Sequence, residues 1–293
     1  MTLRSALARI LAQEELNFLL TNYLPRRLAT TLIGWISKIE HPLIARPSIA
    51  IWKLFSDVDL RDARDTHFAS MHACFTRALR DGARPAVAEP NLLASPCDAI
   101  VGATGAIEGD SVLQIKGFSY SLTELFGDAS LAAQFRDGRY VTLRLTAGMY
   151  HRFHAPHDIT VNQVRYFSGD TWNVNPSSLK RVERLFCRNE RAVISARLDA
   201  GGWPILLVPV AAILVAGIRL RFLDTSALLR EGGPRKVACN VRLAKGEEMG
   251  WFEHGSTIIV LTPRGFETFE GITEGRRVRA GEALLRVPHS TPR

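Results

Sequence analysis

The chain has few cysteines and no pair of them spaced for metal binding or redox chemistry. Its four cysteines, Cys74, Cys97, Cys187 and Cys239, are scattered and form no CxxC motif. This pattern excludes both a disulfide framework and a cysteine-based zinc knuckle. We therefore expect the protein to work in a reducing compartment.

Long apolar runs are also missing. The longest, residues 205–218, is interrupted by Pro209 and Gly217 and is too short for a membrane-spanning helix, so it predicts two buried strands around a turn. No signal peptide is expected, because Arg4 and Arg9 are followed by acidic residues rather than by an apolar stretch. We expect the protein to stay on the cytoplasmic side.

What the chain does have is enough apolar content for a sizeable core and an excess of positive charge. It has 293 residues, 46% of them hydrophobic, and a net charge of +8. A chain of this length and composition buries a core of one large domain, or of a domain with an appendage. The positive charge indicates an acidic partner, either nucleic acid or an anionic lipid surface.

The first 80 residues are predicted to be helical. Apolar residues recur there at helical spacing, namely Leu28, Leu32, Ile33, Trp35, Ile36 and Ile39. Residues 1–55 hold seven Lys/Arg against three Asp/Glu, and they include Trp35 and Trp52. This pattern fits a helix lying in an anionic membrane interface, and equally a helix packed on the protein's own core. A further helical pair is expected over residues 57–80, ending in a turn at 81–85.

After this turn the pattern changes to that of strands. Val141, Leu143 and Leu145 alternate with polar residues, residues 159–167 are strand-like, and glycine breaks recur. The segment from Gly265 resembles a short turn-and-strand unit. The expected fold class is α+β, a mostly antiparallel β-sandwich or barrel-like core with N-terminal amphipathic helices. We divide it into a helical, membrane-associating region (1–80) and a β-rich catalytic domain (81–293).

A glycine-serine pair precedes one predicted strand. The run Ile258–Leu261 predicts a buried strand, and Gly255, Ser256 and Thr257 stand at its mouth. Because glycine has no Cβ, the carbonyl of Gly255 is open to attack by the hydroxyl of Ser256. An ordinary turn into a strand explains the same pattern.

Three histidines cluster near the middle of the chain. His151, His154 and His157 lie in the segment YHRFHAPH. A metal site is not expected, because no second Cys/His pair accompanies them. Histidine is the side chain best suited to move protons near neutral pH, so a role in proton transfer is favoured.

A carboxylate, Asp98, lies between a proline turn and a predicted strand over residues 99–101. It either caps the turn or orients an imidazole. In the second case Asp98, a histidine from 151–157 and Ser256 would form a serine triad, which is recognised by roles rather than by chain order. A G-x-S-x-G elbow is missing, so an α/β-hydrolase is disfavoured.

Several motifs occur together in an order that identifies a family. They are Ser95-Pro96-Cys97-Asp98, Lys116 to Leu122, Tyr150 to Pro156, Arg188-Asn189-Glu190-Arg191 and Lys245 to Thr257. With them the chain, from about Asp57 to Leu285, resembles the bacterial, pyruvoyl-dependent phosphatidylserine decarboxylases.

The resemblance implies self-cleavage between Gly255 and Ser256. It would give a β chain of residues 1–255 and an α chain of residues 256–293, with Ser256 converted into a covalent pyruvoyl cofactor. By the same resemblance, His154 is the general base and Asp98 holds its tautomer and stabilises the imidazolium. The pyruvoyl carbonyl would form a Schiff base with the substrate amine and act as the electron sink for decarboxylation.

His151 is assigned the return of the proton to the carbanion. Residues three apart point to opposite faces of a strand. If both His151 and His154 serve Ser256, residues 151–154 must therefore form a turn or loop.

The resemblance also implies the partners. The substrate would be phosphatidylserine in an anionic membrane surface, converted to phosphatidylethanolamine and carbon dioxide in phospholipid biosynthesis. The protein would be a self-processing zymogen, peripheral on the cytoplasmic face of the membrane, and a homodimer. No nucleic-acid partner is expected, because basic patches with interleaved aromatic residues are missing. No metal is expected either, for the reason given for the histidine segment.

Three positions depart from the family pattern: Ala99 and Ile159 stand where glycine is usual, and His254 where an apolar residue is usual. They affect loop conformation, and His254 could compete as a base. Two other functions stay open. One is a serine hydrolase acting in trans through Asp98, His154 and Ser256, and the other is a non-catalytic lipid-binding or nucleic-acid-binding domain.

Overall fold

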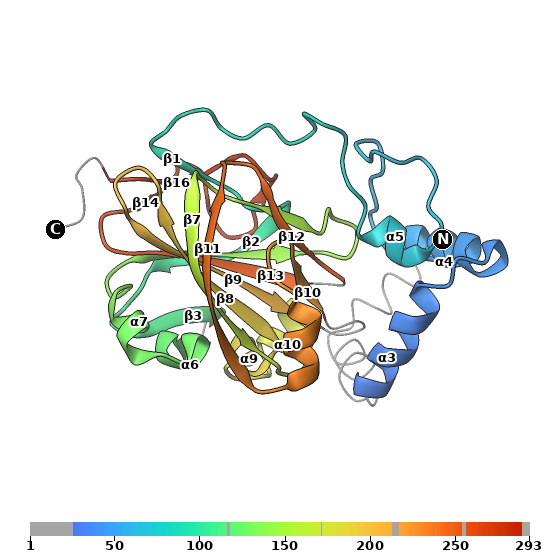
Figure 1. The fold of residues 1–293 in the computed structure, drawn as a ribbon, viewed down its shortest axis with the longest axis horizontal. Coiled ribbons are helices and arrows are strands. Elements are labelled where there is room, and N and C mark those ends of the chain that lie inside the picture. Colours follow the sequence, from blue (N-terminus) through green and yellow to red (C-terminus); the bar gives the residue numbers. More distant parts are fainter. Residues whose placement is uncertain (1–25, 116–117, 171, 213–216, 254–255, 289–293) are drawn as a thin grey trace.

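The chain is built around one antiparallel sheet of eight strands (Figure 1). The computed structural model describes residues 26–115, 118–170, 172–212, 217–253 and 256–288. The strand order is β11-β7-β8-β9-β13-β5-β2-β15. Their bounds are β2 Ala99–Ala106, β5 Arg139–Leu145, β7 Ile159–Phe167, β8 Arg191–Leu198, β9 Pro204–Ala211, β11 Pro234–Leu243, β13 Ser256–Thr262 and β15 Arg277–Val278. The predicted α+β class with a mostly antiparallel core is therefore confirmed.

Three smaller sheets complete the strand content of the described residues. One consists of β10 (Ile218–Leu220), β12 (Glu248–Phe252) and β6 (Arg152–His154). The second consists of β1 (Leu92–Ala94), β16 (Ala283–Arg286) and β14 (Glu267–Thr268). The third is the pair β3 (Ser111–Ile115) and β4 (Phe118–Ser121).

The central strand β13 is buried on both faces of the large sheet. Every residue of β13 is buried. Ile258 and Val260 pack in one apolar cluster, and Ile259 and Leu261 pack in the cluster on the other face. This explains why the sequence shows an unbroken aliphatic run there rather than an alternation. The strands predicted over residues 99–101, 141–145, 159–167 and 258–261 are confirmed.

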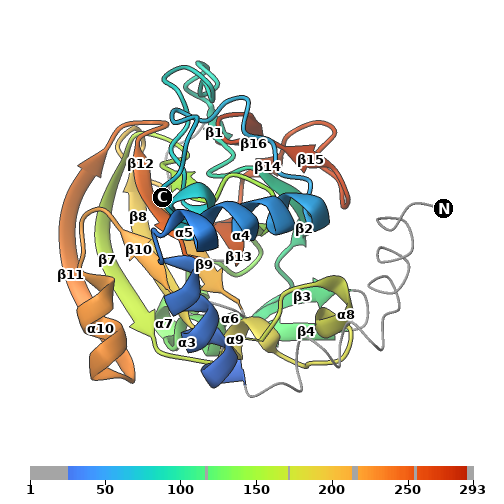
Figure 2. The same cartoon turned by 90° about the vertical axis from the view of Figure 1, so that its right-hand side faces the viewer.

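The helices lie in two groups. Helices α3 (Arg26–Ser37), α4 (Pro42–Phe55) and α5 (Met71–Phe75) gather at one side of the molecule, and Figure 2 shows α4 and α5 crossing in front of β13. The others are α6 (Leu122–Phe126), α7 (Ala129–Ala133), α8 (Pro176–Leu179), α9 (Leu185–Arg188) and α10 (Thr225–Glu231). Within the described ranges, every helix falls short of the length and apolar character that a bilayer span needs.

The helical pair expected over residues 57–80 is wrong. Only Met71–Phe75 is helical there, and Ala63 bridges Leu79 in the extended manner. The Asp59 carboxylate accepts the backbone N–H of Arg61 at 3.0 Å. Aspartate side chains offer the backbone such local turns as an alternative to helix, which outweighs the apolar spacing of this segment.

The turn that residues 151–154 would need if both histidines served Ser256 is not formed. Residues 152–154 form strand β6, which is paired with β12. Close approach of these strands depends on Gly250, because a Cβ at this position would lie 2.0 Å from the carbonyl oxygen of Arg219 and 3.0 Å from the ring of Phe153. The two histidines at 151 and 154 therefore sit at the start and end of an extended segment, with different surroundings.

Candidate active site

Ser256 is the first residue of β13 and is completely buried. Pairing with Leu145 of β5 on one side and Ala211 of β9 on the other fixes its position. Its relative exposure is 0%, and its Oγ makes no hydrogen bond within the described residues. Leaving a buried hydroxyl unpaired is unfavourable, and such groups in native proteins call for a functional explanation. The neighbouring His254 and Gly255 lie outside the described residues.

Ser256 faces a largely apolar cavity of about 420 Å³, which we call the serine cavity. The inner sides of α3, α4 and α5 form one wall, and the ends of the central strands form the other. The lining residues are Ile33, Trp52, Ser56, Met71, Phe75, Arg144, Leu145, Thr146, Ala147, Asn173, Val174, Asn175, Ala212 and Ser256. The N-terminal helices therefore complete the space in front of the serine.

His151 lies against the wall of the serine cavity. Its ring is fully buried and stacks on Phe75, with 3.9 Å between ring centroids. Its Nε2 is 3.4 Å from the carbonyl oxygen of Ala147. Because Phe75 and Ala147 both line the cavity, His151 is next to the space that Ser256 faces.

His154 is held as a neutral base. The carbonyl of Gly246 can only accept, so the Nδ1–H of His154 donates to it at 2.9 Å. Nε2 then carries the lone pair and accepts the hydroxyl of Tyr150 at 3.0 Å. Burial lowers the pKa of His154, and the bond to Gly246 and the charge of Asp98 oppose this shift only in part.

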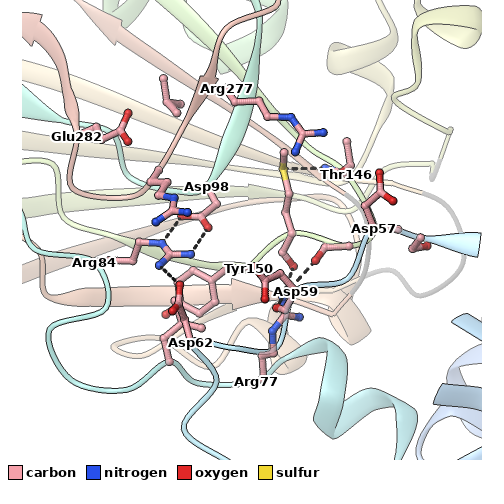
Figure 3. Close-up of a pocket in the computed structure, with 17 residues that line it drawn as sticks. Asp57, Asp59, Asp62, Arg77, Arg84, Asp98, Thr146, Tyr150, Arg277 and Glu282 are labelled. Carbon is pink, nitrogen blue, oxygen red and sulfur yellow. Dashed lines mark hydrogen bonds and ion pairs between the residues drawn. The ribbon is translucent and has the colours of Figure 1, made fainter. Parts of the chain in front are cut away.

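Asp98 is fixed by an arginine and a backbone amide. The Arg84 guanidinium donates from Nε and Nη2 to the two carboxylate oxygens, at 2.8 and 2.7 Å, and the N–H of Ala280 donates at 2.9 Å. Arg84 also donates to Asp62 at 2.9 Å (Figure 3). Such a bidentate pair leaves the Asp98 carboxylate little freedom to rotate.

Asp98 and Tyr150 line a second, polar cavity of about 530 Å³, drawn in Figure 3 and called here the acidic cavity. Its lining holds five carboxylates, which give it its name, beside four arginines; the carboxylates are Asp57, Asp59, Asp62, Asp98 and Glu282. The acidic cavity and the serine cavity share Ser56, Thr146 and Ala147, so they are neighbours.

Three of the four predicted site residues, Ser256, His151 and Asp98, lie at two adjoining cavities, and His154 lines neither of them. Ser256 and His151 lie at the serine cavity. Asp98 and Tyr150 both line the acidic cavity, and the Tyr150 hydroxyl donates to His154. Both ring nitrogens of His154 and both oxygens of Asp98 have the partners named above. A hydrogen-bonded chain from Asp98 through His154 to Ser256 is thus not assembled among the described residues.

Three contributors to the site were not assigned a role from the sequence. Tyr150 donates to His154, Arg84 holds Asp98, and the carbonyl of Gly246 fixes the tautomer that we had attributed to Asp98. Tyr150 could have been found, because it belongs to the histidine motif. Gly246 belongs to the Lys245 to Thr257 motif, but the contact of its backbone carbonyl with His154 is long-range and has no sequence signal. Arg84 lies in no quoted motif.

Metal-ligating groups do not cluster in the structure: the described residues contain no set of three or more His, Cys, Asp or Glu side chains that could hold an ion. All four cysteines are free thiols.

The chain matches a known family over most of its length. The family model described as phosphatidylserine decarboxylase matches residues 71–286. A phosphatidylserine decarboxylase proenzyme from Yersinia pestis (strain Pestoides F) is 36% identical over 281 residues, which cover 92% of this chain and 95% of that protein. A protein of the same name from Yersinia pseudotuberculosis serotype O:1b (strain IP 31758) has the same identity and coverage. Because the family model covers residues 71–286 and a relative is 36% identical over 92% of this chain, the chain belongs to the phosphatidylserine decarboxylase family of enzymes.

Proposed function

We propose that this enzyme converts phosphatidylserine to phosphatidylethanolamine and carbon dioxide, using a pyruvoyl group that it makes from Ser256 by breaking the Gly255–Ser256 bond. Membership of the family supports this proposal. The observation that carries it is the buried Ser256 hydroxyl, which has no partner within the described residues and faces a cavity of about 420 Å³.

The surroundings of Ser256 fit a pyruvoyl group. Conversion removes the hydroxyl and the amine of Ser256, and the described residues make no hydrogen bond to that hydroxyl that would be lost. The cavity also offers room for a lipid head group beside it. A pyruvoyl carbonyl supplies an electron sink for the electron pair that carbon dioxide leaves behind.

In the self-cleavage step, the Ser256 Oγ attacks the carbonyl carbon of Gly255. The hydroxyl proton passes to Nε2 of His154, the amide C–N bond breaks and an ester C–O bond forms. Loss of the Cα proton of residue 256 then eliminates the Gly255 carboxylate and leaves a dehydroalanine at the new N-terminus. Its imine tautomer is hydrolysed by water to the pyruvoyl carbonyl, and ammonia is released. His154 is suited to this role because its pKa is lowered by burial, which leaves Nε2 unprotonated near neutral pH. His154 lines neither cavity, and the extended segment 151–154 directs His151 and His154 to opposite faces, so self-cleavage requires the His154 ring to leave Tyr150 and turn toward Ser256.

Asp98 acts by its fixed charge. Its carboxylate is close enough to raise the pKa of His154, although it makes no hydrogen bond to that ring. It therefore stabilises the imidazolium that forms when His154 takes the serine proton. Arg84 positions the carboxylate for this task.

His151 is placed to handle the proton of the decarboxylation step. It lies behind Phe75 and Ala147, on the wall of the cavity that the head group would occupy. Loss of carbon dioxide leaves a carbanion that must be protonated, and a buried imidazole beside the cavity can deliver that proton without admitting bulk water.

The N-terminal helices provide the membrane contact. Seven large apolar side chains of α3 and α4 are exposed: Leu32, Trp35, Ile36, Leu43, Ile44, Ile51 and Leu54. The inner sides of the same helices line the serine cavity through Ile33 and Trp52. Residues 1–80 would thus be the membrane-associating region, peripheral on the cytoplasmic face, and 81–293 the catalytic domain, in a homodimer as family resemblance implies.

A denaturing gel and a carbon dioxide assay test the proposal together. Wild type should give two bands and release labelled carbon dioxide from carboxyl-labelled phosphatidylserine, whereas Ser256→Ala should give one band and no release. Ser195→Ala is the matched control, because Ser195 Oγ, on β8 of the same sheet, is another buried hydroxyl that has no partner in the described part of the chain. A single wild-type band that Ser256→Ala leaves unchanged would refute self-processing, and two bands without carbon dioxide would favour a hydrolase.

A further inference from the structure

Arg144 stands out among the residues of the serine cavity as a cation without a partner. It lies on β5, and its guanidinium makes no hydrogen bond and no ion pair within the described residues; burial is the one influence on its pKa, with no neighbouring charge beside it. Arg144 is only partly exposed, and burial lowers its pKa. Partly burying an unpaired guanidinium is unfavourable, so an arginine kept in this state indicates an anionic ligand.

A third, small cavity adjoins the serine cavity at Arg144. It measures about 140 Å³ and is lined by Ile100, Val101, Gly102, Gln114, Thr142, Arg144, Leu179, Phe186, Thr257, Glu274 and Gly275. Arg144 is the one residue that lines both this cavity and the serine cavity. The guanidinium is therefore at the junction of the two spaces.

Thr257 adds a second unpaired polar group at the same place. It is directly opposite Arg144 in the pairing of β13 with β5, so the two side chains are on the same face of the sheet. Thr257 is 1% exposed, lines the small cavity, and its Oγ1 has no hydrogen-bond partner within the described residues. A buried hydroxyl beside an unpaired guanidinium forms an oxyanion-binding pair.

We propose that Arg144 and Thr257 bind the phosphodiester of the phospholipid substrate while its serine amine reacts at residue 256. The proposal rests on the function proposed above. Neighbouring residues of a strand point to opposite faces, so the side chains of Ser256 and Thr257 leave β13 on opposite sides. Arg144 links the two sides, because it lines both the serine cavity and the small cavity. In the lipid only two carbons and one oxygen separate the amine from the phosphorus, so a head group that reacts at residue 256 brings its phosphate to the guanidinium.

The phosphate is the better partner than the substrate carboxylate on energetic grounds. The carboxylate loses its negative charge when carbon dioxide departs, so an arginine paired with it would stabilise the ground state more than the transition state and slow the reaction. The phosphodiester keeps its charge throughout. Pairing Arg144 with it binds and orients the lipid without that penalty, and planar arginine suits a phosphate's oxygen pair.

The one acidic residue on the small cavity is Glu274, which is exposed and makes no ion pair with Arg144 within the described residues. It does not neutralise the guanidinium.

The test compares two substrates that differ only in the phosphate. Mature wild type, Arg144→Gln, Arg144→Lys and Thr257→Val are assayed with short-chain phosphatidylserine and with an O-acylserine, in which the serine hydroxyl carries a fatty acyl ester. Arg139→Gln is the matched control, because Arg139 is on the same strand at its other end. Maturation of each variant is read separately on a gel.

We expect Arg144→Gln to mature and to lose about 10- to 100-fold in kcat/KM for phosphatidylserine, mainly through KM, with less than about 3-fold loss for O-acylserine. Arg144→Lys should lie between, Thr257→Val should lose about 3-fold on the phosphate-bearing substrate only, and Arg139→Gln should match wild type. Equal losses on both substrates, or none on phosphatidylserine, would overturn the proposal.

A binding measurement gives a second readout that does not depend on turnover. In calorimetry, glycerophosphoethanolamine should bind wild type about 10-fold more tightly than Arg144→Gln, and ethanolamine should not distinguish them. Inorganic phosphate binding as tightly as glycerophosphoethanolamine would assign the site to free phosphate and overturn the lipid assignment. If Arg144→Gln does not mature, the Arg144→Lys and Thr257→Val assays decide. An inactive, unsplit wild type would instead refute the proposed function.

Discussion

The contacts of His154 leave its Nε2 without a proton, so the rate of self-cleavage should depend on pH. Gly246 takes the Nδ1–H, and burial lowers the pKa of the ring below 6.5. The base is competent while it is unprotonated, so a lowered pKa keeps it active to lower pH. Self-cleavage of newly synthesised precursor, followed on gels across pH, should be independent of pH near 7 and fall with a midpoint below 6.5. A midpoint at or above 6.5 would contradict this assignment.

Tyr150 provides the control for that measurement. Burial raises the pKa of Tyr150, so its phenol stays protonated and donates to Nε2 of His154. This bond stabilises only the neutral ring. Tyr150→Phe should therefore move the pH midpoint of self-cleavage upward, and an unchanged midpoint would remove Tyr150 from the site.

At the scale of single residues, the sequence was informative about chemistry and silent about partners. Ser256, His151, His154 and Asp98 stand in recognisable local motifs, so they could be proposed directly. The groups that orient them, such as Arg84 for Asp98, come from other segments. The unpaired state of Arg144 depends on burial and on what surrounds it, which no local pattern encodes.

Among the elements, the segment between β12 and β13 is tied to the N-terminal helices through Glu253. This side chain is 8% exposed and lies 3.1 Å from Arg219 of β10, 3.6 Å from His72 of α5 and 3.8 Å from Lys38, which follows α3. It lies three positions before Ser256. The Glu253 carboxylate thus links the segment before Ser256 to β10, to α5 and to the residue that follows α3.

The Glu253 contacts predict a pH-dependent stability. Burial alone would raise the pKa of Glu253, but His72, Arg219 and the charge of Lys38 lower it from 4.5 to about 2. Because the folded-state pKa is the lower one, this stabilisation is present above pH 4.5 and is lost as pH falls from 4.5 toward 2. The shift corresponds to about 3 kcal/mol of unfolding free energy.

Urea unfolding of the unsplit Ser256→Ala protein at several pH values measures this contribution. Glu253→Gln should be about 3 kcal/mol less stable at pH 7, and the difference should shrink below pH 4.5. Glu267→Gln, at an exposed position on β14, is the control and should change little. A difference that does not depend on pH would show that the ionised Glu253 is not the cause.

Strands were easier to predict than the connections. The runs that became β5, β7 and β13 have apolar content set by burial on the large sheet, so alternation or an aliphatic run reveals them. The prediction of a helical pair over residues 57–80 was wrong because Asp59 forms a local turn with Arg61. The strand at 152–154 was not predicted, because its pairing with β12 is long-range and depends on the absence of a side chain at Gly250.

For the whole molecule, α3 and α4 lie at one side of the large sheet (Figures 1 and 2). They line the serine cavity through Ile33 and Trp52. Trp35, Leu43 and Ile51 are 67%, 79% and 57% exposed on these helices. Burying such side chains in a lipid interface is favourable, whereas exposing them to water gains nothing. The sequence left open whether this apolar stripe meets lipid or the protein's own core. In the structure some of its side chains are exposed to solvent, and others, such as Ile33 and Trp52, face the protein.

The triple variant Trp35→Ala, Leu43→Ala and Ile51→Ala tests the membrane surface. We expect its binding to vesicles containing anionic lipid to fall by at least about 10-fold, because three apolar anchors are lost, while self-cleavage stays unchanged. Leu113→Ala is the control. Leu113 is 51% exposed on β3, which Figure 1 places away from α4. Undiminished vesicle binding by the triple variant would contradict a membrane role for these helices.

The most direct test of the account is the intact mass of the C-terminal fragment of the purified wild-type protein. We predict a fragment that begins at residue 256, is lighter by one ammonia than the same peptide with an N-terminal serine, and gives no Edman sequence because it lacks an amine. A fragment that begins with an intact serine, or a chain that remains whole through residue 293, would contradict it.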